Sequence, residues 1–204
     1  MSKITLVRFS LVAISLLVLA PSADASHWTR SKAAATSIKT KPRVFRPFSP
    51  SGRSLLRTKT RHGLCFTGSL ATVRRDAWRC FVGNGIVDPC FSSAHVSGSV
   101  LCPRAAWKRT GIRLTLRQPL PRPHGRKASI KLQPWGIQLV DGRHCGMVTG
   151  GTEAIGGLRA NFACGDNDWL WGFPNRSTEP WTIFIAPAGA TALGKRVPIR
   201  RAWM

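Results

Sequence analysis

The sequence predicts a mainly β fold: a single disulfide-braced antiparallel sandwich or barrel-like domain with little helix. From residue 62 onward, short runs of alternating apolar and polar residues recur, separated by turn residues such as glycine and proline. Six cysteines form an even set, as in exported domains that are braced by disulfides. The chain has 204 residues, enough for one such domain with a substantial core.

The alternation is clearest over residues 112–116, where Ile112, Leu114 and Leu116 would face one side of a sheet. Basic and hydroxyl side chains take the intervening positions, which predicts a strand with one apolar face and one wet, basic face. The one helix that the sequence suggests is a turn or two around residues 75–80.

A β-hairpin is predicted where residues 135–140 and 143–148 flank Asp141 and Gly142. An Asp-Gly pair suits the left-handed backbone angles of a two-residue hairpin turn. Further along the chain, alternation predicts two strands that pair antiparallel, a penultimate strand, and a last strand whose proline suits an edge. These strands are residues 158–164, 169–173 and 181–185, and the segment around Pro198.

The N-terminus predicts export. Lys3 and Arg8 precede an apolar run over residues 11–20, and an Ala-x-Ala triplet follows at residues 23–25, so residues 1–25 are expected to be a signal peptide. An uncleaved membrane anchor would need about twenty apolar residues. We therefore expect a secreted or periplasmic protein of the cell envelope with no transmembrane segment after cleavage.

The rest of the chain divides by composition. Residues 26–61 carry ten basic and no acidic residues and show no hydrophobic period, so they are predicted to be a disordered basic leader. Residues 62–204 hold all six cysteines and are predicted to be the β-rich domain.

Three disulfides are the natural interpretation of the cysteines, but the sequence alone does not choose among the pairings. Joining sequence neighbours gives Cys65 with Cys80, Cys90 with Cys102, and Cys145 with Cys164. No C-x-x-C or H-x-x-x-H spacing supports a metal site, so we expect no metal and no cofactor.

Charge is the other strong signal. Lysine and arginine number 31 against 8 aspartate and glutamate, a formal net charge of +23. Such a balance favours anionic partners, here a cell-wall polymer, lipopolysaccharide or nucleic acid. A genome of high GC content, which encodes many arginines, would explain the same balance without any binding function. The sequence does not indicate an oligomeric state.

The best candidate contact surface lies within residues 89–140, which contain nine basic residues and no acidic one. Trp107 lies among them and could stack on sugar rings or bases, although a core tryptophan surrounded by solvated charges is the simpler interpretation. The candidate binding residues are Arg104, Trp107, Lys108, Arg109, Arg113, Arg117, Arg122, Arg126 and Lys127.

One run supports a family resemblance. Residues 74–91 read RRDAWRCFVGNGIVDPCF, and the pattern R-x-D-A-W-R-C followed by G-N-x-I-x-D-P-C-F resembles a widespread group of exported, functionally uncharacterised bacterial proteins and extracellular domains. The likeness extends over Cys65 to Trp203 and implies an exported, cysteine-braced module, with no catalytic assignment. From the residues themselves, Asp76, Asn84 and Asp88 are expected to hydrogen-bond nearby backbone.

No residue pattern assigns a catalytic site. His144 beside Cys145 suggests a nucleophile pair, but neighbours on a strand face opposite sides and a bridged cysteine has no thiolate. The leading hypothesis is an exported, non-catalytic module that binds anionic envelope polymer through a basic surface. Two alternatives stay open: a secreted hydrolase of cell-wall material that uses Asp76, Asp88 or His144, and a structural or protein-partner-binding domain.

Overall fold

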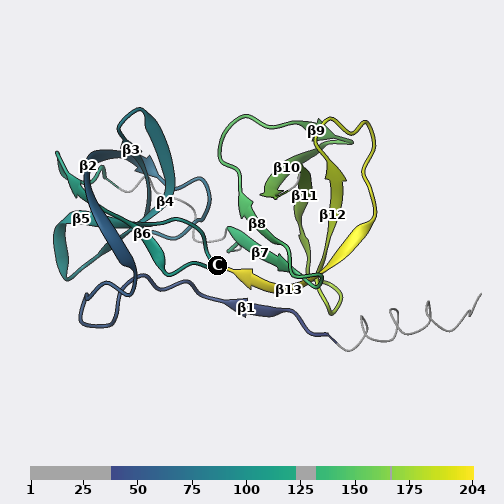
Figure 1. The fold of residues 1–204 in the computed structure, drawn as a ribbon, viewed down its shortest axis with the longest axis horizontal. Coiled ribbons are helices and arrows are strands. Elements are labelled where there is room, and N and C mark those ends of the chain that lie inside the picture. The colour runs from purple at the N-terminus through teal and green to yellow at the C-terminus, as the bar shows by residue number, and fades with distance from the viewer. Residues whose placement is uncertain (1–37, 123–131, 166) are drawn as a thin grey trace, which may run out of the picture.

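A computed structural model describes residues 38–122, 132–165 and 167–204 and shows an all-β protein with closed, barrel-like sheets (Figure 1). No helix occurs among these residues, so none has the length and apolar character needed to cross a membrane. The predicted signal peptide and residues 26–37 of the predicted leader lie outside the described residues.

The first closed sheet is a five-stranded barrel, on the left of Figure 1. Its strands are β2 (Arg57–Gly68), β3 (Ala77–Val82), β4 (Gly85–Ser93), β5 (Val96–Pro103) and β6 (Thr110–Leu116). Each strand pairs antiparallel with the next, and β2 pairs with β6 in parallel to close the ring. We call this unit the first barrel.

The second closed sheet lies on the right of Figure 1 and contains the rest of the strands. We call this sheet and the first barrel together the two barrels. Its ring consists of β7 (Gly136–Leu139), β8 (His144–Met147), β10 (Leu158–Cys164), β11 (Asp168–Asn175), β12 (Thr182–Pro187) and β13 (Arg196–Trp203). These strands pair antiparallel in that order, and β13 returns to β7. Outside the ring, β9 (Ala154–Ile155) pairs with β10, and β1 (Lys41–Arg43) pairs in parallel with β13.

The all-β prediction is confirmed, and two details of it change. The structure has two closed sheets where the sequence suggested one sandwich or barrel, and two of its strand pairings are parallel. Alternation located several strands correctly: Leu114 is fully buried in β6, and β10 pairs antiparallel with β11 as expected. Parallel pairing joins segments far apart in sequence, so no local turn signal announces it.

Disulfides brace both barrels from the inside. Cys65–Cys80 joins β2 to β3, Cys90–Cys102 joins β4 to β5, and Cys145–Cys164 joins β8 to β10, which is the neighbour pairing considered above. All of these cysteines except the half-buried Cys164 are at most 2% exposed, so the bridges fill space in two small cores. Three disulfides indicate that the chain folds in an oxidising environment.

One core cluster contains residues of both barrels and joins them. Residues 38–56, which precede β2, are called the N-terminal segment. Its Phe45 packs edge-on against Trp135, which precedes β7, with 5.1 Å between the ring centroids. The ring of Phe45 also lies 5.5 Å from that of Phe91 in β4. Ala106 and Gly136 meet so closely that a Cβ on Gly136 would lie 2.4 Å from the Cβ of Ala106. Buried aromatic contacts therefore hold the barrels together, and not a linker alone.

The prediction of a disordered leader is wrong for residues 38–61. The Thr40 hydroxyl donates to the carbonyl of Ile199, the amide of Phe45 donates to the carbonyl of Met204, and Leu56 is buried just before β2. The average composition of the segment did not reveal these few apolar residues, because basic residues outnumber them. Their burial and the pairing of β1 with β13 order the segment.

Three local predictions also need correction. Residues 75–80 form a turn and the start of β3 in place of a helix, because alternation lets Trp78 and Cys80 face the barrel core. Pro198 does not mark an edge, since β13 pairs with β1, β7 and β12. The predicted hairpin around Asp141 and Gly142 is present, but only Gly142 takes a positive φ, which fits a three-residue loop.

Truncation of Phe45 tests whether the N-terminal segment is part of the core. Phe45→Ala should lower the free energy of unfolding by about 3–5 kcal/mol, because it removes a buried aromatic side chain between the barrels. Val44→Ala is the matched control: Val44 is 58% exposed, so its loss should change stability by less than about 0.5 kcal/mol. Urea denaturation measures both, and equal effects would contradict the packing of this segment.

Candidate functional site

The candidate site is an open groove of about 860 Å³ at one mouth of the first barrel. Strands β2, β4, β5 and β6 line it. Four of its lining residues are basic and none is acidic: Arg57, Lys59, Arg61 and Arg104. Val87, Cys102 and Ile112 supply apolar lining. We call this feature the mouth groove.

Strand register explains why basic side chains gather there. Lys59 lies opposite Ile112 and Arg61 opposite Leu114 in the pairing of β2 with β6. Opposite residues in a sheet direct their side chains to the same face. Because Leu114 is fully buried, the basic side chains of β2 lie on the inner face of the barrel wall, at the end where the barrel is open.

The barrel is open at this end because the N-terminal half of β2 extends beyond the end of β3. Strand β2 pairs with β6 over residues 57–63, but with β3 only from Gly63 onward. At the crossing, Gly63 pairs with both Leu116 and Val82. A Cβ there would lie 2.1 Å from the carbonyl oxygen of Phe81 and 2.8 Å from Cδ1 of Leu114, so only glycine permits this approach.

The structure places the predicted binding residues in several positions. Arg104 lies in the mouth groove, whereas Lys108 and Arg109 are exposed on the loop from β5 to β6. Arg113 is half-buried on β6. Arg117 and Arg122 are exposed beyond the end of β6, and Arg126 and Lys127 lie outside the described residues.

Three groove residues were missed by the sequence analysis, which assigned Arg57, Lys59 and Arg61 to the leader. A usable signal was present, because basic residues alternate with threonine from residue 57 to residue 61 and lead directly to Gly63 and Cys65. Alternation of this kind is typical of a strand.

Trp107 belongs to the interface between the barrels and does not line the mouth groove. Its ring centroid lies 4.8 Å from that of His144 and 5.9 Å from that of Trp203, and the side chain packs against the cluster that joins the barrels. Burial, with a smaller contribution from the charge of Arg201, lowers the pKa of His144 below its ordinary 6.5. Its neighbour Cys145 is disulfide-bonded and offers no thiol for catalysis.

The motif that carries the family resemblance has structural contacts. Arg74 forms an ion pair with Asp76, donates to the carbonyl of Phe45 and lies 4.5 Å above the ring of Phe91. This arginine therefore fastens the N-terminal segment to the first barrel.

The remaining acidic group of the motif, Asp88, supports a turn. Its carboxylate accepts hydrogen bonds from the Ser69 hydroxyl and from the amide of Leu70. Burial raises the pKa of the Asp88 carboxyl, and these hydrogen bonds oppose the rise. The prediction that Asp88 hydrogen-bonds local backbone is therefore wrong, because the amide that it binds lies 18 residues away in the chain.

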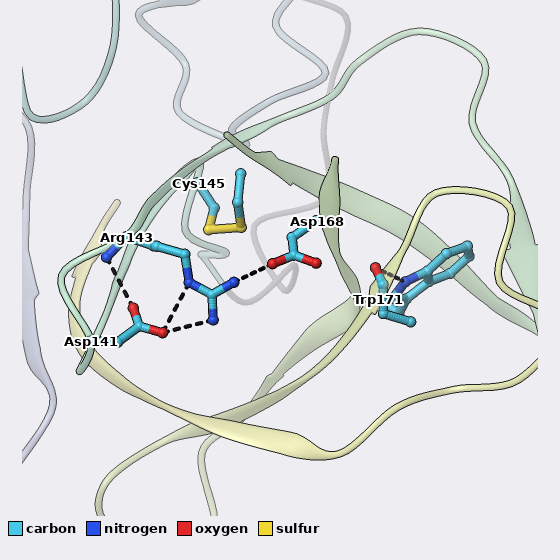
Figure 2. A network of polar contacts seen from close by, with 7 residues as sticks. Asp141, Arg143, Cys145, Asp168 and Trp171 are labelled. Carbon is cyan, nitrogen blue, oxygen red and sulfur yellow. Dashed lines mark hydrogen bonds and ion pairs between the residues drawn. A yellow bond between two sulfur atoms is a disulfide. The ribbon is translucent and has the colours of Figure 1, made fainter. Parts of the chain in front are cut away.

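A second polar network lies in the second closed sheet (Figure 2). Arg143 lies between two carboxylates: it forms ion pairs with Asp141 in the hairpin and with Asp168 at the start of β11. Hydrogen bonding to Arg143 lowers the pKa of Asp141. The network lies beside the Cys145–Cys164 bridge and links the hairpin to β11. Both carboxylates, those of Asp141 and Asp168, form ion pairs with Arg143.

Metal binding has one geometric candidate among the described residues. The sulfur atoms of Cys80, Cys90 and Cys102 lie within 4.8 Å of one another. All three are in disulfides, so they provide no thiolate ligand.

Comparison with known proteins adds no relative: no family model, no curated protein and no solved structure matches this chain. Interpretation of the mouth groove therefore depends on its own residues.

The pKa of His144 predicts a pH dependence. An unfolded histidine takes up a proton near pH 6.5, before the folded one does, so stability should be full above this pH and decline as pH falls through it. His144→Gln should remove this component, whereas His95→Gln, at an exposed histidine on the turn from β4 to β5, should retain it. Melting temperatures from about pH 7.5 to about pH 5 measure the effect. An unchanged dependence in His144→Gln would contradict the assignment.

Proposed function

We propose that this protein is an exported, non-catalytic module that binds an anionic polymer of the cell envelope in the mouth groove. One observation carries the proposal: four basic residues and no acidic residue line an open groove of about 860 Å³. Clefts with charge of a single sign concentrate counter-ions of the opposite sign. A long anionic chain can extend through an open groove, which a closed cavity would not allow.

Arginine and lysine suit such a ligand in different ways. The planar guanidinium groups of Arg57, Arg61 and Arg104 can each hold a phosphate or carboxylate through two hydrogen bonds, whereas Lys59 supplies a compact point charge. Binding of this kind releases counter-ions from the polymer, so affinity falls steeply as salt rises. Apolar lining at Val87 and Ile112 would accommodate the uncharged part of a repeat.

Other basic residues would extend the attraction for a polyanion beyond the groove. They are Lys108, Arg109, Arg113, Arg117 and Arg122, together with Arg126 and Lys127, which lie outside the described residues. At some distance from the bound chain they would accelerate its approach more than they fix its position. The N-terminal signal pattern and the three disulfides support export to the periplasm, envelope or exterior. The resemblance of residues 74–91 to exported bacterial modules agrees with this proposal.

Charge reversal in the groove tests the proposal. Lys59→Glu combined with Arg61→Glu should weaken binding to heparin or a wall teichoic acid by about tenfold or more, and should lower the slope of log affinity against log salt by about two. The matched control is Lys195→Glu with Arg200→Glu, which makes the same change in net charge at exposed positions just before and within β13.

Retention on a heparin column and titration at several salt concentrations measure both pairs. Equal losses for the two pairs would show that net charge, and not the groove, determines binding. Retention that does not change between low and moderate salt would contradict ion-pair binding altogether.

A further inference from the structure

The part of β2 that lines the mouth groove has a free backbone edge. The amide of Arg57 donates to Arg109, and the carbonyl of Gly63 accepts from Arg117, so both ends of this stretch turn their polar groups toward β6. Because backbone direction alternates along a strand, Thr58, Thr60 and His62 turn theirs the other way.

No strand of the described chain pairs with that side of residues 57–61, since the pairing with β3 begins at the junction of His62 and Gly63. Thr60 and His62 are exposed and Thr58 is half-buried. A free edge of this kind is a template onto which an extended chain can add as a further strand. The mouth groove lies alongside it and includes Thr58 in its lining.

Charge determines which chain can add. Arg57, Lys59 and Arg61 project from the same stretch, so a second copy of β2 would place like charges opposite one another. An incoming strand with carboxylates at alternate positions would instead place them opposite these cations, on the inner face where the groove lies.

Backbone chemistry distinguishes a polypeptide from other polyanions. Thr58 and Thr60 each offer an N–H and a carbonyl oxygen on the same edge, and His62 offers an N–H. Phosphate or sulfate oxygens could accept from the N–H groups but would be repelled by the carbonyl oxygens. Only a peptide backbone supplies a donor for each carbonyl and an acceptor for each N–H.

We propose that the free edge of β2 over residues 57–62 binds an extended acidic polypeptide as an added strand, with alternate carboxylates in the mouth groove. The inference rests on the proposed function, because both place the anionic partner in this groove. Six residues of strand span about 20 Å, so a partner segment of about six residues covers the whole edge.

The first experiment uses synthetic peptides with the full chain. A six-residue peptide of alternating glutamate and valine is compared with two N-methylated forms. One is methylated at the amides that would face β2 and the other at the intervening amides. Methylation on the β2 side should weaken binding by about tenfold or more, because two or three backbone hydrogen bonds are lost, whereas the other set should change affinity little.

A variant of the protein provides the reciprocal test. The N–H of Thr60 faces the free edge, so Thr60→Pro removes one donor without breaking the ladder to β6. Peptide affinity should fall by about fivefold or more, while inorganic polyphosphate binds as before. Thr60→Val is the matched control, because it keeps the N–H and the shape of the side chain. Circular dichroism checks that the fold is retained.

The outcomes separate the two proposals. Protection of the amide protons of Thr58, Thr60 and His62 from exchange by the peptide, and not by polyphosphate, supports strand addition. Equal affinity for both N-methylated peptides overturns strand addition, although salt-dependent binding of polyphosphate would leave the proposed function intact. Binding of neither the peptide nor polyphosphate overturns both.

Discussion

The difference in length between two neighbouring strands determines the functional architecture of this protein. Strand β2 has 12 residues and β3 has 6, so β2 pairs with β6 along its first half and with β3 only from Gly63 onward. The crossing requires a residue without a side chain, because the carbonyl of Phe81 occupies the space where a Cβ would lie. The open mouth, its basic lining and the free edge all follow from this arrangement.

The start of β2 is held in place by the core that joins the two barrels. Leu56 is buried immediately before the first groove residue, and Phe45 packs between Phe91 and Trp135. Arg74 adds a hydrogen bond to the carbonyl of Phe45. The N-terminal segment thus couples the stability of the whole chain to the position of the groove residues. Rigid support of this kind limits the entropy lost when a ligand binds.

Local sequence signals predicted the parts of the fold that depend on neighbouring residues. Alternation identified β6 with Leu114 inside, and an Asp-Gly pair located the hairpin of β7 and β8. Sequence neighbours among the cysteines were joined correctly because adjacent strands are antiparallel. In contrast, the parallel pairing of β2 with β6 joins residues about fifty positions apart. The sequence therefore did not predict most of the groove. Of its basic residues only Arg104 was identified, whereas Arg57, Lys59 and Arg61 were assigned to the disordered leader.

Anionic chains are proposed to bind in the mouth groove and not over the basic surface in general. Backbone amide shifts during titration of the isotope-labelled protein with inorganic polyphosphate test this proposal most directly. If the polymer lies in the mouth groove, the largest changes occur at residues 57–61, 102–104 and 110–112. Changes concentrated at Lys108, Arg109 and Arg117, or spread over the second closed sheet, would contradict it.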